Sequence, residues 1–285
     1  MKATLFSRVP YMGPAPRGVW PVPPAAFAPE AAEQSMDAAF EQFQLADELG
    51  FDWITLAEHH YAPLSLTPNP MVMAGAVSQR VRRAKIALLG ANLPSLNPVR
   101  VAEEFAMVDV LTGGRLVAGM LRGTATEYVT YGTNPAESRE RFEEALQLIL
   151  RAWTEPQPFG WLGRFYEYRT VAIWPRPIQQ PHPPIWVPGA GSIETWEWCL
   201  KKDYNYAYLS YSGFKRGQQV LDGFWNKAAE LVSIATRIAQ ASCNSSRSRT
   251  AKPNWKRSSR RTSSTSTRRC CTFMRASATR RVTAR

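Results

Sequence analysis

The chain has 285 residues, 45% of them hydrophobic, which is enough to bury one sizeable core. Its net charge of +12 is unevenly spread, because residues 233–285 hold 14 Lys and Arg and no Asp or Glu, whereas residues 1–232 hold 21 basic and 23 acidic groups. The sequence shows neither an apolar leader nor an apolar run of bilayer length, so we expect a soluble cytoplasmic protein without a membrane partner. The four cysteines have neither zinc-site spacing nor the density of a disulfide framework.

Short apolar runs alternate with amphipathic helical patterns in residues 1–232, which is typical of repeated βα units and a parallel sheet. The first predicted helix has apolar residues at helical spacing from residue 36 to 49 and stops at Gly50. A later helix begins at Asn97-Pro98 and ends before Thr112-Gly113-Gly114, and another carries an apolar stripe over residues 142–153. Six strands are predicted, at residues 3–7, 53–57, 85–90, 115–119, 185–187 and 206–210.

A proline-rich stretch over residues 156–188 interrupts this alternation, with a hairpin predicted at residues 165–173. We interpret it as an insertion, because the strand at 185–187 resumes the βα rhythm. Six strands alone favour an open doubly wound sheet over a (β/α)8 barrel. The motifs below favour the barrel.

Directly after the second predicted strand comes Ala57-Glu58-His59-His60-Tyr61, and Asn69-Pro70 then opens the next helix. This arrangement resembles the bacterial-luciferase-like flavin monooxygenases. The resemblance implies that His60 is an active-site histidine that assists deprotonation, and that the fold is a (β/α)8 TIM-barrel type. The alternative is that His59 and His60 form an exposed or structurally satisfied pair. A metal site is disfavoured, since His182 is the only other histidine.

The longest match covers residues 85–123 and is similar to the family's block of strand, helix, Gly-Gly-Arg and strand ending in Arg-Gly. By this resemblance Arg122 stands at a strand end, where a guanidinium can bind a flavin phosphate. Residues 189–198 resemble the family's phosphate loop and helix start, with Gly191, Ser192 and Thr195 beside the anion. The alternatives are an ordinary surface ion pair for Arg122 and simple N-capping by Ser192.

The turn at Leu89, Gly90 and Asn92 falls where family members lay backbone against the flavin ring, often with a strained peptide bond. Two positions depart from luciferase itself. Leu121 stands where it has a reactive cysteine, and Gly191 where it has an acid. Light emission from a long-chain aldehyde is therefore not implied.

The resemblance implies reduced FMN supplied by a separate reductase, O2 as co-substrate and a small organic substrate that receives one oxygen atom. Family members commonly pair, so a homodimer is expected. The closest alternative keeps the barrel but uses a deazaflavin for hydride transfer. No Gly-rich dinucleotide fingerprint indicates a Rossmann domain.

The tail at 233–285 gives almost no helix or strand signal and is expected to be a disordered basic segment. Back-translated and shifted by one base, it can encode acids and aliphatic residues, which favours a frameshift product. The missing sequence would then be the seventh and eighth βα units, and the barrel would be truncated to about six βα units. The remaining alternative is an inactive remnant whose basic tail binds nucleic acid nonspecifically.

Overall fold

The computed structural model describes residues 2–209 and 212–231, and the backbone of 272–274. The chain divides into two compact units, Met1–Pro188 and Gly189–Arg285, and each is described by itself. The predicted boundary at residue 232, the frameshift hypothesis and the nucleic-acid-binding tail all concern a segment outside the described residues. They stay predictions.

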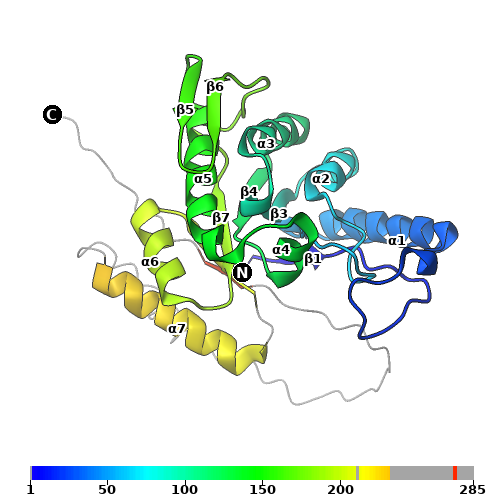
Figure 1. Ribbon diagram of the computed structural model, residues 1–285. Helices are drawn as coiled ribbons and strands as arrows, with labels where there is room; N and C mark the ends of the chain where they lie inside the picture. Colours follow the sequence, from blue (N-terminus) through cyan, green and yellow to red (C-terminus); the bar gives the residue numbers. More distant parts are fainter. Residues whose placement is uncertain (1, 210–211, 232–271, 275–285) are drawn as a thin grey trace. The chain divides into compact units, whose positions relative to one another are not determined.

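The first unit is built on a parallel sheet (Figure 1). Each strand pairs in parallel with the next in the order β1, β2, β3, β4, β7. The α/β class is confirmed, and every strand end lies within two residues of its predicted place. The bounds are β1 Thr4–Ser7, β2 Trp53–Leu56, β3 Lys85–Asn92, β4 Leu116–Leu121 and β7 Ile185–Gly189.

Asparagine caps start two of the helices that cover this sheet. The side chain of Asn69 accepts hydrogen bonds from two backbone N–H groups at the start of α2, and Asn97 does the same for α3. The α3 helix ends at Gly113, whose φ of +63° is a left-handed cap. The bounds are α1 Pro29–Glu48, α2 Pro70–Ser78, α3 Pro98–Thr112, α4 Ala125–Tyr131 and α5 Ser138–Thr154, with 3-10 turns at Pro24–Ala26, Leu93–Ser95 and Pro135–Glu137.

The core of the first unit lies between the sheet and its outer helices. In Figure 1, α2, α3 and α5 stand next to one another, and Trp153 of α5 donates a 2.9 Å hydrogen bond from Nε1 to the carbonyl of Ala102 on α3. Burial of such large side chains stabilises each by about 1.5–3 kcal/mol. The largest fully buried residues include Phe43, Ile54, Leu56, Ile86, Leu88, Phe105, Leu116, Met120 and Trp153.

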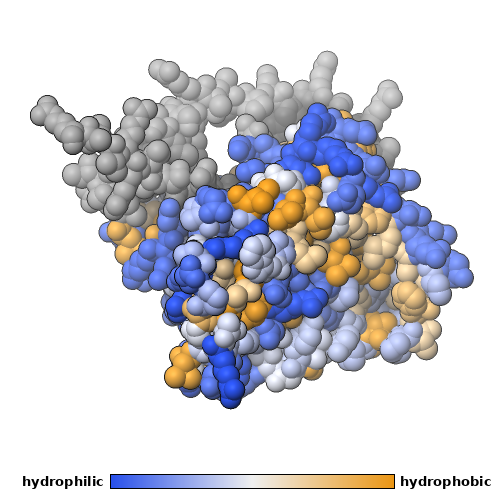
Figure 2. Space-filling model, turned by 90° about the horizontal axis from the view of Figure 1, so that it is seen from above, coloured by the Kyte–Doolittle hydropathy of each residue, from blue (hydrophilic) through white to orange (hydrophobic). Residues whose placement is uncertain are grey.

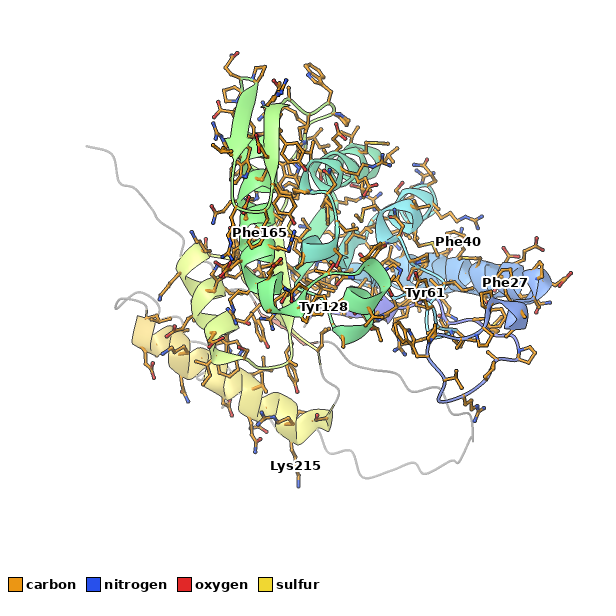
Figure 3. The ribbon with its side chains drawn as sticks, in the orientation of Figure 1. Phe27, Phe40, Tyr61, Tyr128, Phe165 and Lys215 are labelled. Atoms are coloured by element: carbon orange, nitrogen blue, oxygen red, sulfur yellow. The ribbon has the colours of Figure 1, made fainter. Side chains whose placement is uncertain are left out.

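The insertion forms an antiparallel hairpin of β5 (Phe159–Leu162) and β6 (Glu167–Val171). The hairpin predicted at residues 165–173 is therefore placed too late, because Phe165, labelled in Figure 3, lies in the connection between the strands. A contact from a different element, which no local pattern reveals, fixes this connection. The Glu144 carboxylate on α5 accepts hydrogen bonds from the backbone N–H groups of Arg164, Phe165 and Tyr166 and from Trp161 Nε1.

The second unit contains α6 (Ile193–Lys202), β8 (Asn205–Tyr208) and α7 (Gly213–Leu231), and β9 (Thr272–Met274) pairs antiparallel with β8. An aromatic cluster joins these elements, with the rings of Tyr206 and Phe224 stacked 5.4 Å apart. Across the described parts of both units, no helix combines the length and apolar character needed to cross a bilayer.

Candidate active site

The expected site residues of the first unit follow the carboxyl ends of adjacent strands. His60 comes after β2, Asn92 ends β3, and Arg122 comes after β4. Parallel strands end at one common edge of a sheet, so these residues belong to the same edge. Figure 3 shows Tyr61, after β2, and Tyr128, on α4, at this edge of the unit.

Glu58 and His60 form a buried pair. Glu58 is 2% exposed and His60 is 7% exposed, and His60 Nε2 lies 3.1 Å from Glu58 Oε1. Both residues lie in the segment that follows β2, so this contact is made at the carboxyl end of the strand. The alternative of an exposed histidine pair therefore fails for His60, which is enclosed beside a carboxylate.

Asn92 contacts the same carboxylate from the end of β3. Its Nδ2 donates to Glu58 Oε1 at 2.6 Å, and its backbone N–H donates to Glu58 Oε2 at 3.2 Å. Asn92 is itself buried. Glu58 thus joins two of the expected site residues, His60 and Asn92. Sequence reasoning had given Glu58 no role.

His59 has a different carboxylate partner. Its Nδ1 lies 3.4 Å from Glu127 Oε1, and Glu127 also accepts hydrogen bonds from the backbone N–H and hydroxyl of Thr124 in a capping box. Burial raises the pKa of Glu127, but the hydrogen bonds from His59 and Thr124 outweigh it and lower the pKa to about 2. Glu127 therefore stays ionised and ties α4 to the segment after β2.

Two aromatic residues flank His60. The Tyr131 ring meets the His60 ring edge-on, with centroids 5.0 Å apart. Burial, followed by the nearby charge of Glu58, raises the pKa of Tyr131, so its hydroxyl keeps its proton. The backbone carbonyl of His60 accepts a 3.1 Å hydrogen bond from Trp20 Nε1. The loop before α1 is thereby fastened to the histidine segment.

Leu89 and Gly90 lie where the paired strands β3 and β4 approach each other closely. The peptide bond between them is cis, and Leu89 is fully buried. A Cβ on Gly90 would stand 2.4 Å from the carbonyl oxygen of Gly119, which is far inside van der Waals contact. Only glycine fits there, so the identity of Gly90 has a structural reason whether or not a ring lies against it.

Arg122 follows β4 and is exposed. Its backbone carbonyl accepts a 2.9 Å hydrogen bond from the Tyr128 hydroxyl, and Gly123 next to it has a φ of +98°. Within the described residues, the guanidinium has no hydrogen-bond or ion-pair partner, so the surface ion pair considered above is not observed there.

The remaining expected residues belong to the second unit. Gly191 has a φ of +116°, a conformation that favours glycine, and Ser192 occupies the N-cap position of α6 without a capping bond from its side chain. Thr195 lies in the first turn of α6. The capping role considered for Ser192 is therefore not used, and its hydroxyl stays available.

Beside this loop, the buried Tyr206 hydroxyl lies next to the Trp196 side chain and the backbone of Gly191. Tyr206 Oη stands 3.3 Å from where a Cβ on Gly189 would be. Burial raises the pKa of Tyr206 to about 12, so the hydroxyl remains a donor. The positive φ of Gly191, the start of α6 and the Ser192 hydroxyl, which makes no capping bond, are features that fit an anion such as a phosphate group.

Sequence reasoning missed the roles of both carboxylates, although each had a signal. Glu58 stands two residues before His60 at a strand end, and Thr124 with Glu127 spells a capping box. In the described parts of the chain, no group of three or more His, Cys, Asp and Glu is arranged for a metal ion.

Comparison with known proteins identifies a family. The model of the family described as luciferase-like monooxygenase matches residues 17–230. The oxygenase component of flavin-dependent trigonelline monooxygenase from Acinetobacter baylyi is 28% identical over 204 residues, which cover 70% of this chain and 56% of that protein. The chain spans about half the length of the curated relatives it matches.

Solved structures place the fold among barrel-type monooxygenases. Monooxygenase RslO1 from Streptomyces bottropensis matches with a TM-score of 0.66 and 28% identity, over 81% of this chain and 66% of that one. The oxygenating constituent of 3,6-diketocamphane monooxygenase from Pseudomonas putida, in complex with FMN, matches with a TM-score of 0.65 and 19% identity, over 81% and 62%. An F420-dependent secondary alcohol dehydrogenase shares the fold with a TM-score of 0.58 and 19% identity, over 68% and 60%.

Proposed function

Because the chain belongs to the luciferase-like monooxygenase family, we propose that it is a flavin-dependent monooxygenase that uses reduced FMN and O2 to oxygenate a small organic substrate. The buried pair of Glu58 and His60 after β2 carries this proposal, because a histidine beside a carboxylate can accept and return protons. The trigonelline oxygenase and the FMN complex support the choice of flavin.

When bound, reduced flavin supplies the electrons that activate O2. The chain's own residues bind the flavin and move protons. His60 exchanges a proton with the reacting groups, while Leu89 and Gly90 offer backbone for the flavin ring. Arg122 provides a guanidinium for the phosphate in the first unit. In the second unit, considered by itself, Gly191, Ser192 and Thr195 at the start of α6 offer donors to an anion.

Two protein partners belong to the proposal. A separate reductase would supply the reduced FMN, as the name "oxygenase component" of the trigonelline relative suggests for that protein. A second copy of this chain would cover apolar side chains that α2 and α3 expose, namely Val72, Met107 and Leu111. Figure 2 shows hydrophobic residues reaching one face of the molecule in separate groups among hydrophilic ones.

Anaerobic titration with reduced FMN and reduced riboflavin tests the cofactor and its phosphate contacts together. We expect FMN to bind at least about tenfold more tightly than riboflavin, because riboflavin lacks the phosphate. In Arg122→Gln, most of this difference in affinity should disappear. Arg100→Gln is the matched control, since Arg100 lies exposed on α3 and pairs with Glu104. The proposal would be contradicted if Arg122→Gln weakened the binding of FMN and of riboflavin equally, or if the unaltered protein bound no flavin.

The second candidate function is hydride transfer with a deazaflavin. The fold shared with the F420-dependent dehydrogenase favours it, since one barrel serves both cofactors in the proteins compared. Titration with reduced deazaflavin, together with oxygen uptake, separates the two. Preference for the deazaflavin without oxygen uptake would replace the monooxygenase proposal.

A further inference from the structure

Three hydrogen-bond donors converge on the buried carboxyl group of Glu58. Asn92 contributes its backbone N–H and its Nδ2, and His60 contributes Nε2 at 3.1 Å. Within the described residues, no Lys or Arg forms an ion pair with Glu58. Its position is therefore set by hydrogen bonds that reach it from two different strand ends.

This arrangement settles which nitrogen of His60 carries the proton. A carboxylate only accepts hydrogen bonds, and the amide groups of Asn92 only donate through the atoms that face it. Nε2 of His60 must then be a donor as well. Because a neutral imidazole has one N–H, Nδ1 keeps the free lone pair.

We propose that Glu58 and Asn92 are positioning residues that hold neutral His60 in the tautomer protonated at Nε2, which makes Nδ1 the nitrogen that accepts and returns protons. Asn92 acts through Glu58, since its two hydrogen bonds fix both carboxylate oxygens. The tautomer follows from the contacts alone, whereas the use of Nδ1 as a base rests on the proposed function.

The pair of His59 and Glu127 provides an internal comparison. There Nδ1, not Nε2, faces the carboxylate, at 3.4 Å. The same reasoning assigns the proton of neutral His59 to Nδ1. Two adjacent histidines are thus expected to show opposite tautomers, each imposed by its own carboxylate.

Nitrogen NMR of the imidazole rings tests the proposal without flavin or substrate. The chain has only three histidines, so the signals of selectively labelled protein can be assigned with His59→Gln, His60→Gln and His182→Gln. Under conditions where His60 is neutral, we expect its signals to show protonated Nε2 and unprotonated Nδ1. The Nδ1-protonated tautomer of His60 in the unaltered protein would overturn the proposal.

Glu58→Leu then tests the cause. Leucine is of similar size and has no acceptor, so Nε2 of His60 loses the oxygen that it shares with Asn92 Nδ2, and we expect the single-tautomer signature of His60 to be lost. Glu127→Gln is the matched control, which should change the signals of His59 and leave those of His60 in place. An unchanged His60 tautomer in folded Glu58→Leu would refute the role of Glu58. Failure of flavin binding would instead count against the proposed function only.

Discussion

Trp20 Nε1 donates a 3.1 Å hydrogen bond to the backbone carbonyl oxygen of His60, across 40 residues of sequence. The loop before α1 is therefore fastened to the histidine segment by a single polar contact from a large side chain. The carbonyl depends on this donor because His60 is nearly excluded from water.

Trp20→Phe keeps an aromatic ring and removes the donor. We expect unfolding free energy to fall by about 0.5–1.5 kcal/mol, the net value of one hydrogen bond. Denaturant unfolding measures it. Trp174→Phe is the control, because Trp174 also precedes a proline but is 86% exposed. Equal effects of the two changes would show that the hydrogen bond contributes nothing.

Glu127 makes stability depend on acid. Its folded pKa of about 2 lies below the ordinary value of 4.5, so its contribution is fully present above pH 4.5 and is lost as the pH falls from there toward 2. The shift corresponds to roughly 3 kcal/mol at neutral pH. In Glu127→Gln, this part of the acid dependence should disappear.

Unfolding measured at pH values from 7 down to 2.5 checks this. Glu33→Gln, an exposed position on α1, should keep the parent's pH profile. If Glu127→Gln loses stability with the same slope as the parent, the carboxylate does not carry the effect.

Gly90→Ala should disrupt the pairing of β3 with β4. Its new methyl group would meet the backbone of Gly119 at 2.4 Å, and neither backbone can move without loosening the sheet, so we expect a loss of about 1–3 kcal/mol or more. Gly75→Ala is the matched control within α2, where the nearest atom is 4.0 Å away and alanine should stabilise the helix by about 0.5–1 kcal/mol. Thermal unfolding of the two variants should shift in opposite directions.

The apolar face of α2 and α3 should mediate pairing. Val72 is 71% exposed and Met107 is 51% exposed. Val72→Glu would place a charge where a second copy is proposed to dock, so the dimer should dissociate to monomers. Analytical ultracentrifugation measures this. Val129→Glu on α4 is equally exposed and should leave the association unchanged; a monomeric parent protein would end the proposal.

Local signals in the sequence were sufficient for most of the fold. Asn97 and Gly113 mark the ends of α3 by chemistry that acts within one helical turn. The hairpin was misplaced because Glu144, on a different element, decides where its connection lies. His60 was identified by resemblance. The contact between its partner Glu58 and Asn92 spans 34 residues of sequence, so only the placement of the strands side by side reveals it.

The way Glu144 holds the hairpin connection has a practical consequence. A carboxylate on α5 gathers the backbone amides of the turn, so the position of the hairpin depends little on its outward side chains, and Leu162 there is 84% exposed. A fluorophore, affinity handle or immobilisation point could be introduced at residue 162 without touching the histidine segment. The hairpin is thus a ready place for labelling this protein.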